Sequence, residues 1–169
     1  MPIKRQRLGQ HMLVDDKVLA SIINAAEVSK NETVCEAGTG LGFLTAELCR
    51  RAKYVLSFEV DKELLRRARQ ELQFDNLELI AGDAFRSSDL AFDVFVSNLP
   101  YSRSRDAIEW LATQKFDRSV VMVQREFAEK LAAAPGDRDY RAISALANYC
   151  FKIDRVTSVD RKSFSPMPN

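Results

Sequence analysis

Short apolar runs alternate along the chain with stretches whose apolar residues recur every three or four positions. The runs predict strands over residues 33–37, 53–61, 77–84, 93–97 and 119–123, and a sixth strand over 153–159. The helical spacing predicts a helix capped by Asp15 or Asp16 that extends to about residue 26. It also predicts helices over about 41–51, 62–72, 106–114, 126–133 and 140–149.

Strands that alternate with helices are typical of an α/β protein with a mostly parallel sheet and helices on both faces. In such Rossmann-like sheets, ligands bind beyond the carboxyl ends of the strands. Polar or glycine residues follow the predicted strands at this edge: Glu36, Gly38, Glu59, Asp83, Asn98, Tyr101 and Gln124. Each alone is typical of a cap or turn, but together they predict a shared site.

The stretch 34–45 predicts a buried strand, a glycine turn and the first turn of a helix. Gly38, Gly40 and Gly42 allow a ligand to approach the backbone closely, and the helix start offers free N–H groups. The pattern differs from the Gly-x-Gly-x-x-Gly of dinucleotide-binding enzymes, because Phe43 stands where the third glycine would be.

Glu59 lies about 20 residues after the first glycine, where a carboxylate accepts hydrogen bonds from ribose hydroxyls in both NAD and S-adenosylmethionine enzymes. Asp83 adds an acceptor for an adenine amino group, and we assign its neighbour Ala84 to the same cofactor site. The glycine turn has no Lys or Arg to hold a phosphate, which favours S-adenosylmethionine over NAD. Its positive sulfonium suits an acidic edge that includes Glu36. An NAD-type oxidoreductase remains the alternative.

The tetrapeptide Asn98-Leu99-Pro100-Tyr101 after the fourth strand suits methylation of the exocyclic amine of a base. The Asn98 side-chain oxygen and a nearby carbonyl can accept hydrogen bonds from the two N–H groups of such an amine. These hydrogen bonds direct the lone pair of the nitrogen towards the methyl group. Pro100 stiffens the turn, and Tyr101 offers a stacking face. The alternative is a plain turn, which Asn-x-Pro sequences often form.

Composition fits one globular domain of 169 residues, with 46% apolar and 29% charged residues and a net charge of +1. No apolar run approaches the roughly 20 residues that span a bilayer, and no apolar signal region follows the basic start. The three cysteines are scattered, so we expect no metal site and a reducing cytoplasm.

The small net charge means that any nucleic-acid binding must come from local groups of basic residues. The candidate phosphate contacts are Lys4, Arg5, Arg7, Arg103 and Arg105. Ordinary solvated surface charge is the alternative for each of them.

Several motifs occur in an order and spacing that resemble a known family: 10–13, 36–42, 58–61, 82–84, 98–101, 124–130, 135–140 and 164–168. The chain resembles the KsgA-type ribosomal RNA adenine dimethyltransferases over essentially its whole length. The erythromycin-resistance methyltransferases are close cousins, but Pro135-Gly136 followed by Tyr140 favours the ribosome-assembly branch.

The resemblance implies N6-dimethylation of two adjacent adenosines near the 3′ end of small-subunit rRNA, with S-adenosylhomocysteine as product and a link to ribosome biogenesis. It implies cofactor contacts by His11, Leu13, Gly38, Glu59, Asp83 and Asn98, to which the glycine turn adds Gly40. It implies target-base contacts by Asn98, Leu99, Tyr101 and Phe164, with an unstacked adenine held between Tyr101 and Phe164.

Three features depart from the family pattern. His11 stands where Asn is usual, 102–106 replaces an apolar continuation, and the sequence stops where relatives continue into a small helical domain. We therefore expect residues 1–169 to form a monomeric catalytic domain without that part, with residues 1–14 as a basic arm and cofactor cover. The expected partner is small-subunit rRNA or the immature small subunit. A ribosome-assembly factor whose methylation is dispensable, or a methyltransferase for another amine, remains possible.

Overall fold

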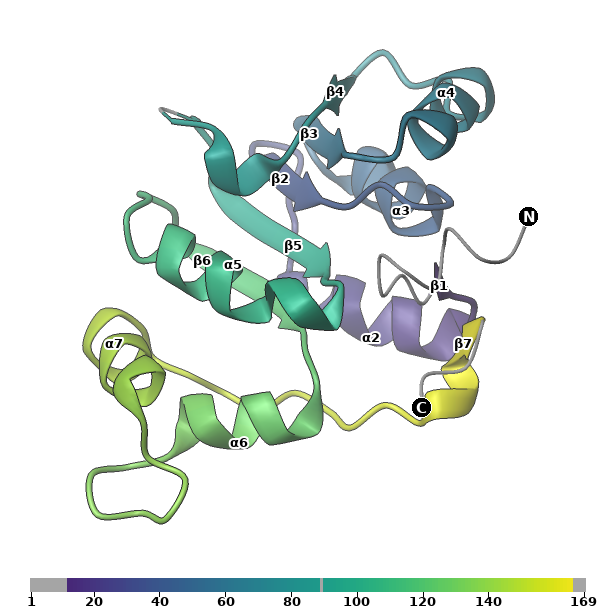
Figure 1. Ribbon diagram of the computed structural model, residues 1–169. Coiled ribbons are helices and arrows are strands. Elements are labelled where there is room, and N and C mark those ends of the chain that lie inside the picture. The colour runs from purple at the N-terminus through teal and green to yellow at the C-terminus, as the bar shows by residue number, and fades with distance from the viewer. Residues whose placement is uncertain (1–11, 89, 166–169) are drawn as a thin grey trace.

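The structure is a computed structural model that describes residues 12–88 and 90–165 (Figure 1). Its strands are β1 Met12–Leu13, β2 Thr33–Ala37, β3 Tyr54–Glu59, β4 Leu77–Ala81, β5 Val94–Asn98, β6 Arg118–Met122 and β7 Phe164–Ser165. Its α-helices are α2 Asp16–Ala26, α3 Phe43–Arg51, α4 Lys62–Glu71, α5 Ser104–Leu111, α6 Arg125–Ala132 and α7 Ala142–Cys150. Short 3-10 helices are η1 Ala84–Arg86, η2 Tyr101–Arg103 and η3 Arg161–Ser163.

The main sheet has five parallel strands in the order β4-β3-β2-β5-β6. The chain moves outward from β2 through β3 to β4, and then returns to β5 on the other side of β2. The direction of winding therefore reverses between β2 and β5, and in an open α/β sheet this reversal opens a crevice for a ligand. The predicted α/β fold is confirmed.

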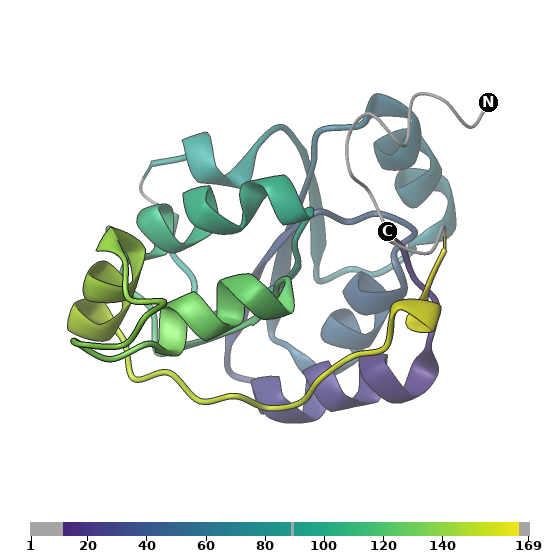
Figure 2. The same ribbon diagram turned by 60° about the horizontal axis from the view of Figure 1, so that its bottom comes forward.

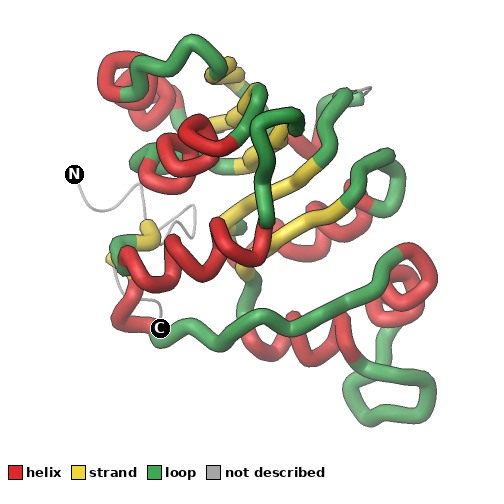
Figure 3. Tube along the Cα trace, turned by 180° about the vertical axis from the view of Figure 1, so that it is seen from behind, coloured by secondary structure: helices red, strands yellow, loops and turns green. Residues whose placement is uncertain are grey.

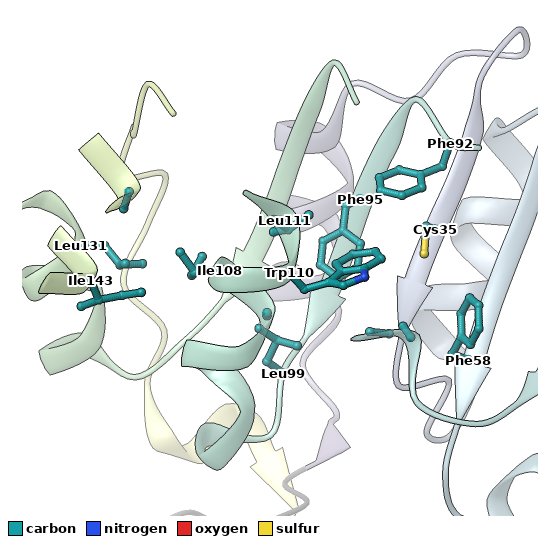
Figure 4. Close-up of a cluster of buried hydrophobic side chains, with 14 residues drawn as sticks. Cys35, Phe58, Phe92, Phe95, Leu99, Ile108, Trp110, Leu111, Leu131 and Ile143 are labelled. Atoms are coloured by element: carbon teal, nitrogen blue, oxygen red, sulfur yellow. The ribbon is translucent and has the colours of Figure 1, made fainter. Parts of the chain in front are cut away.

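Side chains alternate across the sheet and feed two separate cores. Val34 of β2 packs with α2 and α3, whereas its neighbour Cys35 packs on the opposite face with α5 to α7. Figure 4 shows the second core, in which Trp110 lies among Phe92 and Phe95. The Phe92 and Trp110 rings stack with centroids 5.8 Å apart, and Trp110 Nε1 donates to the Ser87 carbonyl at 3.2 Å.

Aspartates begin several of the helices that follow the strands. Asp15 accepts from the N–H groups of Lys17 and Val18 at the start of α2, and Asp61 caps α4 in the same way. Helix α3 instead has Gly42 as its N-cap residue, with a φ of +82°. The turns that border the site are therefore fixed by local hydrogen bonds and by glycine.

The predicted sixth strand over 153–159 is wrong. Residues 151–160 form neither helix nor strand, and they pass α6 as an extended connecting segment between α7 and η3 (Figures 2 and 3). Among the described residues no strand lies beside it to supply ladder hydrogen bonds, because the sheet ends at β6. Its apolar residues Ile153 and Val156 consequently stay exposed.

A second, two-stranded sheet joins segments from opposite ends of the described chain. Strand β1 pairs antiparallel with β7, with Met12 opposite Ser165 and Leu13 opposite Phe164. Such short strands have too few residues for an alternating pattern, so the sequence did not predict them. In the described part of the chain, no helix combines the length and apolar character that a membrane span requires.

Candidate active site

A cavity of about 280 Å³ opens at the carboxyl ends of β2, β3, β4 and β5. Loops after these strands, together with β1, β7 and the start of α2, form its walls. Its lining includes residues 13–16, Leu19, 37–44, 58–60, 82–85, 98–101, Arg103 and Phe164. The cavity therefore collects the strand ends to which the sequence assigned a shared site.

The glycine turn forms one wall and is held in place by β3. Gly38 N–H donates to the Phe58 carbonyl at 2.8 Å, and Gly40 N–H donates to Glu59 Oε2 at 2.9 Å. Gly38 has a φ of +90°, and a Cβ atom added there would meet no heavy atom within 4 Å. The backbone at Gly38 is thus open to a ligand in the cavity, as the sequence predicts for a close approach.

Glu59 lies at the end of β3 with only 4% of its surface exposed. Its Oε2 accepts from Gly40 N–H, and its Oε1 accepts from Asp61 N–H at 2.9 Å. Each carboxylate oxygen can accept a second hydrogen bond, so this fixed carboxylate can still receive hydroxyl donors from a ligand.

Asp83 follows β4 on the same side of the cavity. Its Oδ1 accepts from Phe85 N–H at 3.1 Å, and its Oδ2 lies 2.8 Å from Arg103 Nη2. Arg103 lines the cavity, whereas the sequence assigned it to RNA phosphates. This ion pair links the loop after β4 to the loop after β5.

The tetrapeptide Asn98-Leu99-Pro100-Tyr101 lines the cavity throughout. It starts at the last residue of β5 and runs into η2, where Arg103 N–H donates to the Pro100 carbonyl at 2.8 Å. Leu99 is buried with 3% exposure, and burial raises the pKa of the Tyr101 hydroxyl. The Tyr101 hydroxyl therefore stays neutral near pH 7.

Phe164 lines the same cavity from β7. It pairs with Leu13 through the β1–β7 ladder, and Ser163 Oγ donates to Asp15 Oδ2 at 2.7 Å. This hydrogen bond lowers the pKa of the Asp15 carboxyl. The late segment of the chain is thereby attached to the start of α2.

Glu36 was expected to contact the cofactor, but the structure does not bring it to the cavity. It is fully buried and is not among the lining residues. Its Oε2 accepts from Thr45 Oγ1 and Ser57 Oγ, both at 2.6 Å, because its position on β2 directs it towards α3. Ser57 Oγ also lies 2.7 Å from the hydroxyl of Thr39, which does line the cavity. Glu36 therefore supports the glycine turn from beneath.

Most of the other predicted site residues line the cavity: Leu13, Gly38, Gly40, Glu59, Asp83, Ala84, Asn98, Leu99, Pro100, Tyr101 and Phe164. His11, Lys4, Arg5 and Arg7 lie outside the described residues. Arg105 is not a lining residue; its Nε pairs with Glu109 Oε1 at 2.7 Å on the solvent-facing side of α5.

Asp15, Val60 and Phe85 also line the cavity, although the sequence did not predict them as site residues. Val60 adjoins Glu59, and Phe85 follows Asp83 by two positions, so proximity to a strand end is the signal that could have found them. Among residues 12–88 and 90–165, no cluster of three or more His, Cys, Asp or Glu side chains could hold a metal ion.

The sequence matches a known protein family. The family model described as "Ribosomal RNA adenine dimethylase" matches residues 2–169. The chain is 40% identical over 162 residues to the probable ribosomal RNA small subunit methyltransferase A of Pyrococcus abyssi, covering 96% of this chain and 60% of the relative. It is 39% identical over 167 residues to the Methanosarcina mazei protein of the same description, covering 98% and 62%.

Two solved structures are similar over most of the chain. A dimethyladenosine transferase from Plasmodium falciparum has a TM-score of 0.85 at 34% identity, covering 94% of this chain and 59% of that one. The 23S rRNA methyltransferase ErmE has a TM-score of 0.80 at 31% identity, covering 94% and 65%. The chain spans about 60% of the length of the first of the curated relatives.

Proposed function

Because the chain belongs to the ribosomal RNA adenine dimethylase family, we propose that it methylates adenine N6 amines of ribosomal RNA with S-adenosylmethionine. The specific targets would be two adjacent adenosines near the 3′ end of small-subunit rRNA, dimethylated as a step of ribosome biogenesis in the cytoplasm. One observation carries the proposal. The tetrapeptide 98–101, which suits an exocyclic amine, shares one cavity with the carboxylates of Glu59 and Asp83, which suit a nucleoside.

The residues present fit the proposed cofactor. The open backbone at Gly38 allows a close approach, and Glu59 and Asp83 offer acceptors at successive strand ends. Leu13 and Ala84 add apolar surface to the same cavity, which suits an adenine ring. A carboxylate-rich site without a phosphate-binding lysine also suits a cationic ligand more than a pyrophosphate. His11 and Gly40 complete the proposed contacts, and S-adenosylhomocysteine would be the product.

When bound, S-adenosylmethionine supplies an electrophilic methyl group on a positive sulfonium. The Asn98 side-chain oxygen would accept a hydrogen bond from one N–H group of the target amine, and a backbone carbonyl of 98–101 would accept one from the other. This would orient the nitrogen lone pair, and proximity and orientation together would supply most of the acceleration. No general base is required, since the nitrogen becomes acidic once it carries the methyl group.

Tyr101 and Phe164 would hold the unstacked adenine from two elements of the cavity wall, η2 and β7. Stacking on an aromatic side chain contributes about 1–3 kcal/mol per base. Leu99 and Pro100 would shape the turn between them. The partner would be small-subunit rRNA or the immature subunit, with Lys4, Arg5, Arg7 and Arg105 as the proposed phosphate contacts.

The proposal assigns residues 1–169 to one catalytic domain that acts as a monomer, with residues 1–14 as a basic arm and cofactor cover. Substitution Asn98→Ala tests the chemistry. We expect methyl transfer to small-subunit rRNA or immature subunits to fall by at least about 10²-fold, because the amine loses its orientation. Binding of S-adenosylhomocysteine, measured by calorimetry, should be partly retained.

Asn24→Ala on the exposed face of α2 is the matched control and should keep full activity. Full activity of the Asn98→Ala enzyme would refute the proposed role of the tetrapeptide. Mass spectrometry of the rRNA product identifies the methylated nucleosides and separates this substrate from other amines.

A further inference from the structure

Arg103 lies between two loops that line the cavity, the loop after β4 and the loop after β5. It ends η2, two residues after the tetrapeptide, and its side chain returns to the loop that follows β4. Nη2 lies 2.8 Å from Asp83 Oδ2, and Nε lies 3.0 Å from Asp106 Oδ2 on α5. The guanidinium therefore bridges two carboxylates on different elements.

The ring of Phe85 supports the same guanidinium from one face. The Arg103 Cζ atom lies 5.3 Å from the Phe85 ring centroid, within the range of a cation–π contact. Phe85 in turn packs against Trp110, with ring centroids 5.6 Å apart, and against Phe95 at 6.4 Å. The support for Arg103 thus continues into the aromatic core and is rigid.

Asp83 is held at both oxygens as a result. Phe85 N–H fixes Oδ1, and Arg103 fixes Oδ2, so the carboxylate plane cannot rotate freely. Each oxygen keeps the capacity for a further hydrogen bond, which an amine donor can use. An N–H donor of a ligand therefore meets a carboxylate that is already oriented.

We propose that Arg103 is a positioning residue for the cofactor, which orients Asp83 to recognise the amino group of the adenine, and not a phosphate contact. The inference rests on the proposed function in one respect, that the cavity takes S-adenosylmethionine with its adenine at Asp83. An RNA phosphate would have to replace two carboxylates and an aromatic ring as partners of Arg103. The neighbouring Arg105 is more exposed, at 65% against 36%, and has one surface partner, Glu109.

Calorimetry with two ligands tests this role. The first ligand is S-adenosylhomocysteine, and the second is its inosine analogue, which carries a carbonyl oxygen in place of the adenine amino group. The unaltered chain should prefer the first ligand, because a carboxylate accepts from an amine and repels a carbonyl oxygen. Arg103→Ala should reduce this preference about tenfold, the loss expected when one charge-assisted hydrogen bond no longer orients the acceptor.

Three further variants show whether Arg103 acts through Asp83. Asp83→Asn should also reduce the preference, and combining it with Arg103→Ala should add little, as expected for two residues that act as one unit. Arg103→Lys should restore part of the preference, because a lysine can contact Asp83 but cannot reproduce the planar fork. Arg105→Ala is the matched control and should leave the preference unchanged.

The outcomes separate the two proposals. Binding of S-adenosylhomocysteine with an undiminished preference by a folded Arg103→Ala variant overturns the positioning role and leaves the proposed function standing. A raised KM for rRNA with unchanged ligand preference would assign Arg103 to the RNA instead, and also overturns the inference. A folded unaltered chain that binds neither ligand overturns the proposed cofactor and the inference together.

Discussion

The Glu36 carboxyl is fully buried beneath the glycine turn, and this burial raises its pKa to about 7. The hydroxyls of Thr45 and Ser57 partly offset the effect, because their hydrogen bonds favour the charged form. Its Oε1 has no hydrogen-bond partner among the residues that the structure describes. A carboxyl in this position carries a proton at mildly acidic pH, whereas an exposed carboxyl does not.

Glu36 should therefore make the stability of the fold depend on pH in an unusual range. Between the ordinary pKa of 4.5 and about 7, the folded chain holds a proton that the unfolded chain releases. This contribution is complete below about pH 4.5 and is lost as the pH rises through about 7. We expect Glu36→Gln to remove it, a change on the order of 3 kcal/mol across that range.

Urea unfolding of the unaltered chain and of Glu36→Gln at pH 5 and pH 8 measures the effect. The variant should show the weaker dependence on pH and should gain relative stability at pH 8. Equal dependence in both proteins would mean that Glu36 is ionised throughout. By contrast, burial raises the pKa of the Cys35 thiol to about 12, so this cysteine should stay unreactive in the native protein at either pH.

The same residues show how far the sequence could predict the site. Glu59, Asp83 and Asn98 end strands or follow them, and their place on the chain alone brings them to one cavity. Glu36 also lies near a strand end, but its position in the two-residue alternation directs it to the α3 side. Arg103 could not be placed, since its direction depends on Asp83 and Phe85, which are distant from it in sequence.

Among the secondary-structure elements, α2 and β6 are joined by hydrogen bonds from one side chain as well as by apolar packing. Arg118 of β6 donates from Nε to the Ala26 carbonyl at 2.8 Å and from Nη2 to the Glu27 carbonyl at 2.7 Å. It also forms two hydrogen bonds with Glu32, at 2.7 and 3.0 Å. The guanidinium thus satisfies carbonyls at the end of α2, where a positive charge is favourable.

Arg118→Met should lower the free energy of unfolding by about 2 kcal/mol at pH 7, since charge-assisted hydrogen bonds and a bidentate pair are lost together. Urea unfolding measures the change. Arg67→Met is a suitable control, because Arg67 pairs with Glu71 where both side chains are about half exposed. Loss of that surface pair should lower the free energy of unfolding by less than about 1 kcal/mol. A similar decrease for both variants would contradict the special role of Arg118.

The dependence of stability on pH in the acid range gives a second measurement on the pair of Arg118 and Glu32. Arg118 lowers the pKa of Glu32 from 4.5 to about 2. A lowered pKa stabilises the fold above about pH 4.5, and this stabilisation is lost as the pH falls through about 2. The difference in stability between the unaltered chain and Arg118→Met should therefore shrink over this range.

The sequence predicted the elements of the main sheet well because each has its own pattern. Strands β2 to β6 were all predicted, with shifts of a few residues at most at their ends. The prediction was wrong for residues 153–159, because alternation of apolar and polar residues cannot show whether a neighbouring strand is present. Strands β1 and β7 are far apart in the sequence, and a pattern within two residues cannot predict that they pair.

For the molecule as a whole, the connecting segment 151–160 is the longest of the exposed segments without helix or strand among residues 12–88 and 90–165. It has neither helix nor strand, and the Lys152 side chain is 90% exposed. We expect brief trypsin digestion to cut the described chain first after Lys152 or Arg155, because a protease needs extended, accessible backbone. Mass spectrometry of a time course identifies the cuts.

Replacing Lys152 and Arg155 with Gln should remove these early cuts. Within the described residues, first cuts at α4 or α5 would contradict the expectation. After cleavage, Phe164 should be held mainly by the β1–β7 pairing and by the bond between Ser163 and Asp15. Methyl transfer should then decline faster than the helical signal in circular dichroism.

The pairing of β1 with β7 also sets the order in which the site is completed during synthesis. A ribosome makes the chain from its N-terminus, and parts already released begin to fold. Leu13, the glycine turn and the tetrapeptide 98–101 emerge early, whereas Phe164 emerges long after them. A nascent chain can therefore build its sheet and still lack one wall of its cavity. Full ligand affinity would be reached only when β7 pairs with β1.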